Sequence, residues 1–321
     1  MNRRRLGRTS IEVTELGFGA APLGNLHAAL SDEAAAVTVE RAWEQGVRYF
    51  DTAPHYGLGL SERRLGTALA GRPRDEYVVS TKVGRLLVDN PAPTGSDLAA
   101  ADFDVPDDLM RVRDYSADGV RRSLESSLSR LGLDRVEIAL VHDPEDFMDD
   151  ALRQAIPALI ELREQGVIGA VGAGMNFAEP LQRIVAESDV DVVMVAGRWT
   201  LADRRAAPLV DACAERGVSV LAAAPFNSGL LAHAWPPDGA LFDYRPAPPD
   251  VLARARQLAE ACQRHAQQLP HAALRFPLRQ RAVAAVVTGM RTAEHVSANV
   301  GWATADLPDD LWKELDAFSA G

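Results

Sequence analysis

Short apolar runs alternate with helical patterns along the whole chain, and this alternation restricts the folds that the chain can adopt. Eight candidate strands can be placed, at residues 15–19, 48–51, 77–82, 136–142, 168–172, 190–196, 218–223 and 284–288. Repeated strand–helix units favour a parallel sheet, because the helix carries the chain back to start the next strand in the same direction. Eight such units predict an α/β fold of the (β/α)₈ TIM-barrel class.

The joins between helices and strands support this prediction. Helical patterns at residues 31–45, 151–165 and 206–216 are followed at once by Gly46, Gly166 and Gly217, and Ser31 is a plausible N-cap for the first. Glycine tolerates the left-handed conformation that commonly ends a helix. An open, doubly wound sheet is the alternative, but the Gly-x-Gly-x-x-Gly motif expected after its first strand is not completed by residues 17–21.

Three further segments complete the predicted architecture. Residues 3–13 contain Gly7-Arg8-Thr9-Ser10 between two short extended runs, which predicts a β-hairpin that could plug the bottom of a barrel. Long connections at residues 90–118 and 233–249 follow the third and seventh strands. Both follow strand ends where a barrel places its active site, so we expect substrate covers. No low-complexity linker divides the chain, which predicts one domain over residues 1–321.

Composition narrows the class of protein. The 321 residues are 47% hydrophobic and 25% charged, which is ordinary for a globular protein with a sizeable core. A net charge of −11 disfavours nucleic acid and anionic membranes as partners. Cys213 and Cys262 show neither metal-ligand spacing nor a disulfide framework. With no signal-peptide pattern and no long apolar run, we expect a cytoplasmic protein with no metal site; the oligomeric state is left open.

Four chemically active residues fall at or just after successive strand ends. Asp51 ends the second strand, Tyr56 follows it in the loop, Lys82 ends the third strand, and His142 ends the fourth. In a parallel barrel these strand ends are neighbours on one rim, so the four side chains can converge. Taken singly, such residues are more often caps, solvated lysines or structural histidines. Their joint occurrence favours a catalytic set.

The four residue types make sense together as a proton-transfer site. A tyrosine is a poor acid or base at neutral pH, but a nearby ammonium favours the phenolate and lowers the pKa of the phenol. We expect Lys82 to play this part for Tyr56, and Asp51 to keep Lys82 charged and oriented. A neutral His142 would hydrogen-bond the reacting oxygen and align it with Tyr56.

This set resembles the catalytic tetrad of the aldo-keto reductase superfamily, and the contexts Phe50-Asp51-Thr52-Ala53, Ser61-Glu62-Arg63-Arg64-Leu65-Gly66 and Ser80-Thr81-Lys82 match its signatures. The segments 114–123, 141–146, 196–201 and 225–231 are similar to the branch that holds D-threo-aldose 1-dehydrogenases, also called L-fucose dehydrogenases. The resemblance implies an NAD(P)-dependent oxidoreductase. It would oxidise an aldose of the L-fucose, L-galactose or D-arabinose type at C1 to the lactone, with pyridoxal 4-dehydrogenase or general carbonyl reductase activity as alternatives.

The resemblance also implies contacts to the dinucleotide, in the loop after the seventh strand, at the eighth strand and following helix, and after the fifth strand. The residues so implied are Gly174, Asn176, Pro225, Phe226, Asn227, Ser228, Gly229, Leu230, Gly289, Arg291, His295 and Asn299. Gly174, Ala196 and Ala223 depart from the superfamily pattern around the nicotinamide. Gly289 and His295 stand where basic residues often hold a 2′-phosphate, which leaves Arg291 as the strong cation and favours NAD over NADP.

Substrate contacts need several donors and acceptors with an aromatic platform. The candidates are His55, Arg85, Asp143, Arg198 and Trp199, with Asp243 and Tyr244 on the second long connection. Trp302 and Trp312 are expected to anchor the C-terminal region to the core.

Two rival functions keep the same fold. In one, Lys82 would form a Schiff base with a carbonyl substrate, as in an aldolase. That reading gives Tyr56 and the loop after the seventh strand no role. In the other, the chain would be a nucleotide-binding regulatory subunit with little turnover, and the intact set of four residues argues against it.

Overall fold

The computed structural model describes residues 1–318, and its centre is a closed barrel of eight parallel strands. The strands, in chain order, are β3 (Leu16–Gly19), β4 (Tyr49–Asp51), β5 (Val78–Val83), β8 (Val136–His142), β9 (Ile168–Met175), β10 (Val192–Ala196), β11 (Ser219–Ala223) and β14 (Val283–Gly289). Each strand pairs with its sequence neighbours among these eight, and β14 closes onto β3. The predicted barrel is therefore confirmed, with every predicted strand within three residues of its observed ends.

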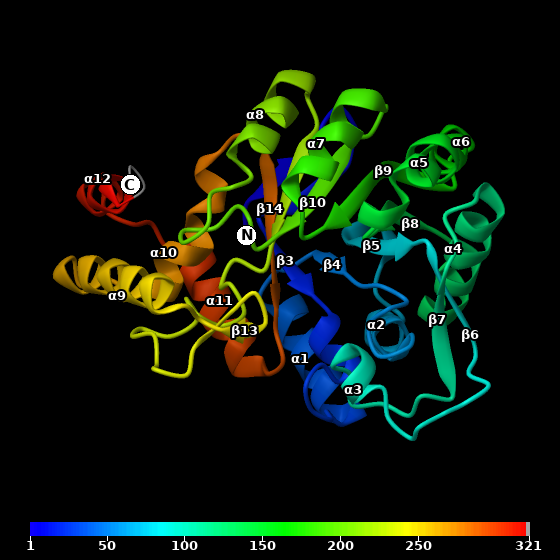
Figure 1. Ribbon diagram of the computed structural model, residues 1–321, viewed down its shortest axis with the longest axis horizontal. Coiled ribbons are helices and arrows are strands. Elements are labelled where there is room, and N and C mark those ends of the chain that lie inside the picture. The colour runs from blue at the N-terminus through cyan, green and yellow to red at the C-terminus, as the bar shows by residue number, and fades with distance from the viewer. Residues whose placement is uncertain (319–321) are drawn as a thin grey trace.

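Helices surround the barrel (Figure 1). They are α1 (Asp32–Glu44), α2 (Leu60–Leu69), α4 (Ala117–Leu131), α5 (Met148–Asp150), α6 (Ile156–Glu164), α7 (Ala178–Glu187), α8 (Ala207–Arg216), α9 (Pro249–Arg264), α10 (Leu269–Arg275), α11 (Ala293–Thr304) and α12 (Asp309–Ala317). Ser31 caps α1 by accepting a hydrogen bond from Ala34 N at 3.2 Å. Gly46, Gly166 and Gly217 have φ angles of 85°, 75° and 65°, as the helix-ending pattern predicted.

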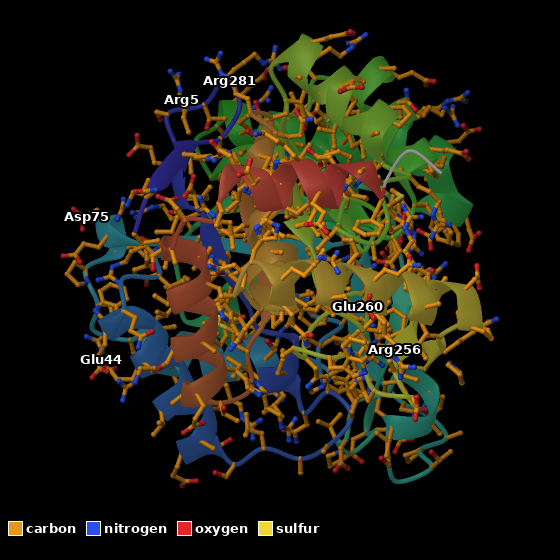
Figure 2. All side chains as sticks on the ribbon, turned by 90° about the vertical axis from the view of Figure 1, so that its left-hand side faces the viewer. Arg5, Glu44, Asp75, Arg256, Glu260 and Arg281 are labelled. Carbon is orange, nitrogen blue, oxygen red and sulfur yellow. The ribbon has the colours of Figure 1, made fainter. Side chains whose placement is uncertain are left out.

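The N-terminal hairpin closes one end of the barrel. Strands β1 (Arg3–Arg5) and β2 (Glu12–Thr14) pair antiparallel. Leu6 and Val13 of the hairpin are fully buried and belong to the same apolar cluster as Tyr49 and Ile138 inside the barrel. Arg5 and Arg281 mark this end of the molecule in Figure 2. The predicted plug is therefore present, and the strand ends that carry the candidate residues lie at the opposite end.

The first long connection is more ordered than the sequence suggested. Strand β6 (Arg85–Asp89) starts almost directly after β5 and pairs antiparallel with β7 (Leu109–Arg113), with α3 (Leu98–Ala101) between them. Part of the predicted long connection over residues 90–118 is thus a β-ribbon. The resulting ribbon lies beside α4, away from α9 (Figure 1). It brings charged side chains to the rim of the barrel.

The second long connection contains a small hairpin. Strands β12 (Leu241–Phe242) and β13 (Arg245–Pro246) pair antiparallel, and α9 begins at Pro249, where the predicted connection ends. Asp243 and Tyr244 form the turn, with φ angles of 51° and 62°. Positive φ at both central residues is the geometry that a two-residue hairpin turn requires, because it matches the twist of the two strands.

Other predictions about the core can be compared with the structure. Trp302 and Trp312 are partly buried against the main apolar cluster, as expected for anchors of α11 and α12. Cys213 and Cys262 are buried free thiols, and burial raises the pKa of each to about 12. Within residues 1–318, no helix is both long enough and apolar enough to cross a bilayer.

Candidate active site

The four predicted catalytic residues converge at the C-terminal ends of β4, β5 and β8, which are adjacent in the barrel. Lys82 Nζ lies 2.7 Å from Asp51 Oδ2 and 3.1 Å from the phenol oxygen of Tyr56. The rings of Tyr56 and His142 have centroids 6.1 Å apart, nearly perpendicular to each other. The barrel register produces this arrangement, because Asp51 pairs with Ser80 and Lys82 with Leu140 on neighbouring strands.

The ammonium of Lys82 has all three of its hydrogens engaged. Besides Asp51 and Tyr56, it donates to the backbone oxygen of Thr52 at 2.9 Å. Burial disfavours the charge on Lys82, but Asp51 and Tyr56 outweigh burial and raise the pKa of Lys82. Lys82 is therefore a fixed cation at neutral pH. Because an ammonium can only donate, the phenol oxygen of Tyr56 accepts from Lys82, and its own hydrogen is free to point to a reacting oxygen.

The acidity of Tyr56 differs from the expectation. Burial raises the pKa of Tyr56, Lys82 lowers it, and Asp51 raises it again, with a net effect above the ordinary value of a phenol. Lys82 thus lowers the pKa of Tyr56 as expected, but burial outweighs this effect, so the net shift is upward and not toward neutral pH. Tyr56 holds its proton at neutral pH, which suits a proton donor, and as a base it must act at higher pH.

His142 is held neutral, as expected. Burial lowers the pKa of His142 well below its usual value, and the positive charges of Arg85 and Lys82 lower it further. The phenol of Tyr115 donates to the backbone oxygens of His142 and Asp143, at 2.6 and 2.9 Å. This contact holds the turn after β8, where Asp143 has a φ of 46°.

A charged group lies next to these four residues. Arg85, from β6, forms an ion pair with Asp143 and donates to Nδ1 of His55 at 3.2 Å. Burial lowers the pKa of His55 to about 2, with Arg85 and Arg111 adding to the effect, so His55 is neutral. Because a guanidinium can only donate, Nδ1 of His55 accepts the hydrogen bond from Arg85. The neutral imidazole of His55 therefore carries its hydrogen on Nε2. The rim thus combines a cation, a carboxylate and a neutral donor.

The loop after β11 contains several residues with positive φ. Ala224, Asn227 and Ser228 have φ angles of 52°, 46° and 56°, and Gly229 follows at 95°. Within the loop, the N–H groups of Asn227, Gly229 and Leu230 donate to the backbone oxygens of Ala224, Phe226 and Asn227 at 3.1, 3.1 and 3.2 Å. The loop is therefore a compact series of turns at the C-terminal end of β11, and a contact with the pyrophosphate of a dinucleotide stays a prediction.

A small cavity adjoins this loop. Its lining includes Asn176, Ala196, Arg198, Ser228 and Tyr244. Arg198 Nη1 lies 2.5 Å from Asp243 Oδ1, and Tyr244 N donates to Ser228 Oγ at 3.0 Å, so the β12–β13 turn covers the cavity.

The amino-acid sequence also matches a known protein family. The match to the aldo/keto reductase family covers residues 15–320. The chain belongs to the aldo/keto reductase family. This assignment agrees with the closed barrel and with the resemblance found in the sequence.

Several relatives of this aldo/keto reductase are known. It is 46% identical over 309 residues to D-threo-aldose 1-dehydrogenase of a Pseudomonas species, covering 95% of this chain and 94% of that one. It is 38% identical to pyridoxal 4-dehydrogenase of Microbacterium luteolum, with coverage of 98% and 96%. It is 31% identical to L-galactose dehydrogenase of Arabidopsis thaliana, with coverage of 94% and 88%.

A solved aldo-keto reductase of Bacillus halodurans, in its holo form, superposes with a TM-score of 0.80 at 26% identity, covering 99% of this chain and 96% of that one. The likeness in shape therefore extends over almost the entire aldo/keto reductase chain described here.

The structure does not bring every predicted substrate residue of the aldo/keto reductase to the tetrad. His55, Arg85 and Asp143 lie beside it. Arg198 lines the covered cavity instead, and Trp199 is 7% exposed with its ring against Phe276, 5.4 Å between centroids. The position of Trp199 fits a core residue better than a substrate contact.

The predicted dinucleotide residues differ in what their side chains can reach. The side chain of Asn227 is held by Thr200 Oγ1 at 2.6 Å and by Gly197 O at 2.9 Å. Leu230 is fully buried, and Asn299 is 4% exposed. The N–H groups of Asn227 and Leu230 are also engaged, donating to the backbone oxygens of Ala224 and Asn227. Gly289 and His295 are exposed.

Sequence reasoning missed several residues that support the site. Tyr115 was noted only as part of a segment shared with relatives, and Arg111 lies in the long connection after the third predicted strand. Arg111 donates to the backbone oxygen of His55 at 2.7 Å and is paired with Asp97. Ser80 could have been found, because it lies two residues before Lys82 and so on the same face of the strand.

Proposed function

We propose that this aldo/keto reductase oxidises cyclic hemiacetals of the aldose type at C1 to the lactone, with NAD as the hydride acceptor. The observation that carries the proposal is the charged group of Arg85, Asp143 and His55 beside the tetrad. A carboxylate accepts hydrogen bonds from hydroxyl groups, and a guanidinium and an imidazole N–H donate to them. This combination suits a polyol better than a simple aldehyde.

The residues of the chain divide the reaction between them. A bound nicotinamide supplies the acceptor for the hydride that leaves C1. Tyr56 takes the proton of the C1 hydroxyl, and Lys82 stabilises the phenolate that this requires. Neutral His142 hydrogen-bonds the same oxygen and fixes its direction. The C1–H and O–H bonds break, the C1–O double bond forms, and the sugar leaves as a lactone.

The preference for NAD rests on Arg291. Its guanidinium donates to the backbone oxygens of Leu26, Ala28 and Ala29, at 3.2, 3.0 and 2.6 Å. A 2′-phosphate would have to compete with these contacts. Gly289, at the end of β14, offers no cation. The site therefore favours the dinucleotide without the phosphate.

Pyridoxal is the second candidate substrate, supported by the 38% identity to pyridoxal 4-dehydrogenase. Pyridoxal also forms a cyclic hemiacetal, so both candidates share one reaction. An aromatic substrate would rely more on stacking and less on the Arg85–Asp143 pair. The two candidates therefore differ in how much they depend on that pair.

A panel of substrates tests the proposal. Purified protein is mixed with L-fucose, L-galactose, D-arabinose, L-glucose or pyridoxal, each with NAD and with NADP, and reduced nicotinamide is followed by absorbance. We expect turnover of at least one aldose, with a higher kcat/KM for NAD than for NADP. Turnover of pyridoxal alone would favour the second candidate. Tight nucleotide binding without turnover of any carbonyl or alcohol would support a regulatory subunit.

A further inference from the structure

Two hydroxyl groups extend the tetrad into the interior of the barrel. The phenol oxygen of Tyr49 lies 3.0 Å from Ser80 Oγ, and Ser80 Oγ lies 2.7 Å from Asp51 Oδ1. Both side chains are fully buried. With the contact from Asp51 to Lys82 and that from Lys82 to Tyr56, an unbroken chain of hydrogen bonds joins Tyr49 to the reacting phenol.

The direction of these hydrogen bonds follows from the charges. Asp51 is paired with the fixed cation Lys82, so its carboxylate accepts hydrogen bonds only. The single hydrogen of Ser80 therefore goes to Asp51, and Tyr49 must donate to Ser80. Burial and the charge of Asp51 raise the pKa of Tyr49 well above its usual value, so this hydrogen stays on the phenol. The hydroxyl hydrogen of Tyr49 thus points to Ser80, and that of Ser80 points to Asp51. Both hydrogens carry partial positive charge on the side that faces the carboxylate.

The barrel makes room for Tyr49 specifically. A Cβ atom on Gly17 of β3 would lie 2.7 Å from Cδ1 of Tyr49, so Gly17 leaves the space that the ring occupies. Around the ring lie apolar side chains, including Ile138 and Leu140. A buried hydroxyl is unfavourable unless it is hydrogen-bonded, and a phenylalanine could fill the same space without one. The hydroxyl is therefore explained by its contact with Ser80.

We propose that Tyr49 and Ser80 are positioning residues that set the charge distribution of the Asp51–Lys82 pair and, through it, the proton affinity of Tyr56. Hydrogen bonds to Asp51 Oδ1 draw its charge away from Lys82. Lys82 then offers more of its positive charge to the phenol. This inference rests on the proton-transfer role of Tyr56 in the proposed function.

Removing either hydroxyl has a defined consequence. Without the donor at Ser80, negative charge on Asp51 is less dispersed, and Asp51 is one of the groups that raise the pKa of Tyr56. The phenol then becomes harder to ionise. The other titratable and charged groups around Tyr56 are Lys82, Asp143, His55 and His142. The two histidines are neutral at and above neutral pH, and Lys82 stays charged. None of these three residues therefore masks the change in the pKa of Tyr56.

The test compares Ser80→Ala and Tyr49→Phe with the parent protein. In each variant we expect the midpoint of the pH profile of kcat for oxidation to move upward, by about half a unit to one unit for Ser80→Ala and by less for Tyr49→Phe. The double variant should move no further than Ser80→Ala, because Tyr49 acts through Ser80. A titration of tyrosinate absorbance, with the Tyr56→Phe signal subtracted, should show the same order without relying on turnover.

Thr81→Val is the matched control. Thr81 is equally buried on the same strand, but its hydroxyl donates to Glu62 at 2.7 Å, on the side away from Asp51. This variant should lose stability while its pH midpoint remains that of the parent. Unchanged midpoints in both Ser80→Ala and Tyr49→Phe would overturn the inference and leave the proposed function intact. Normal turnover of Tyr56→Phe would instead remove the proposed function.

Discussion

Lys82 Nζ lies 3.1 Å from the phenol oxygen of Tyr56, although the two residues are 26 positions apart in the sequence. The contact is produced by the barrel, since β4 and β5 are adjacent and both end at the same rim. It fixes the phenol oxygen as an acceptor from Lys82 and leaves the hydrogen of Tyr56 for a substrate. The proposed chemistry depends on this one contact.

Replacing Lys82 by methionine tests that dependence. Lys82→Met leaves the carboxylate of Asp51 buried without its partner, which should reduce the free energy of unfolding by about 3–5 kcal/mol. Oxidation should be nearly abolished. The double variant Asp51→Asn/Lys82→Met should regain much of the stability and none of the activity. Denaturant unfolding and kcat measure the two effects, and near-normal turnover of Lys82→Met at neutral pH would contradict the account.

The rate of oxidation should rise with pH. Tyr56 must be deprotonated to accept the hydroxyl proton, and burial raises the pKa of Tyr56, so the phenolate fraction is small at neutral pH and grows as pH increases. We expect kcat for oxidation to increase from about pH 6 to about pH 10 through a single ionisation, with the midpoint of that ionisation at or above the upper end of this range. His55 and His142 should not add a second limb, because both are neutral over this range. A flat profile would not be compatible with Tyr56 as the base.

The Arg85–Asp143 pair should affect the sugar more than the dinucleotide. Arg85→Gln and Asp143→Asn each weaken a hydrogen bond to a charged group, so we expect KM for the aldose to rise about 10-fold to 100-fold. The Kd of NAD should stay near the parent value. Arg113→Gln is the control, because Arg113 lies opposite Arg85 on the ribbon and pairs with the exposed Asp146 at 3.2 Å. Equal effects of Arg85→Gln and Arg113→Gln on KM would argue against a specific role.

The turn between β12 and β13 should control access to the dinucleotide site. Arg198 holds Asp243 over the cavity, whose lining includes the predicted dinucleotide residues Asn176, Asn227 and Ser228. Asp243→Asn should weaken the closure and increase the dissociation rate of NAD by about 10-fold. Asp238→Asn is the control, since Asp238 lies on the same connection but pairs with Arg256. Stopped-flow fluorescence measures the rate, and an unchanged rate in Asp243→Asn would exclude this role.

The sequence was most informative where chemistry and topology coincide. Asp51, Lys82 and His142 are predictable because parallel strand ends meet at one rim, so residues far apart in the chain converge without knowledge of packing. Gly46, Gly166 and Gly217 located helix ends, because their conformation is a local property. Both kinds of prediction depend on backbone geometry alone.

Other features depend on packing that the sequence does not display. The raised pKa of Tyr56 results from burial in the folded site, which local sequence could not reveal. The β6–β7 ribbon joins residues 85–89 with residues 109–113 across a stretch rich in Pro, Asp and Ala, so no short turn signalled the pairing. The contact between Arg111 and His55 could therefore not be predicted from the sequence. Trp199 follows the polar Arg198, yet its ring faces the core.

The central claim is that Tyr56 moves the proton. The direct measurement is the turnover of Tyr56→Phe, with the Kd of NAD measured on the same preparation and Tyr244→Phe as a control for loss of an exposed phenol near the covered cavity. The account predicts that kcat for oxidation falls by about 10²-fold to 10⁴-fold while Kd stays near the parent value. Turnover of Tyr56→Phe equal to that of the parent protein would contradict it.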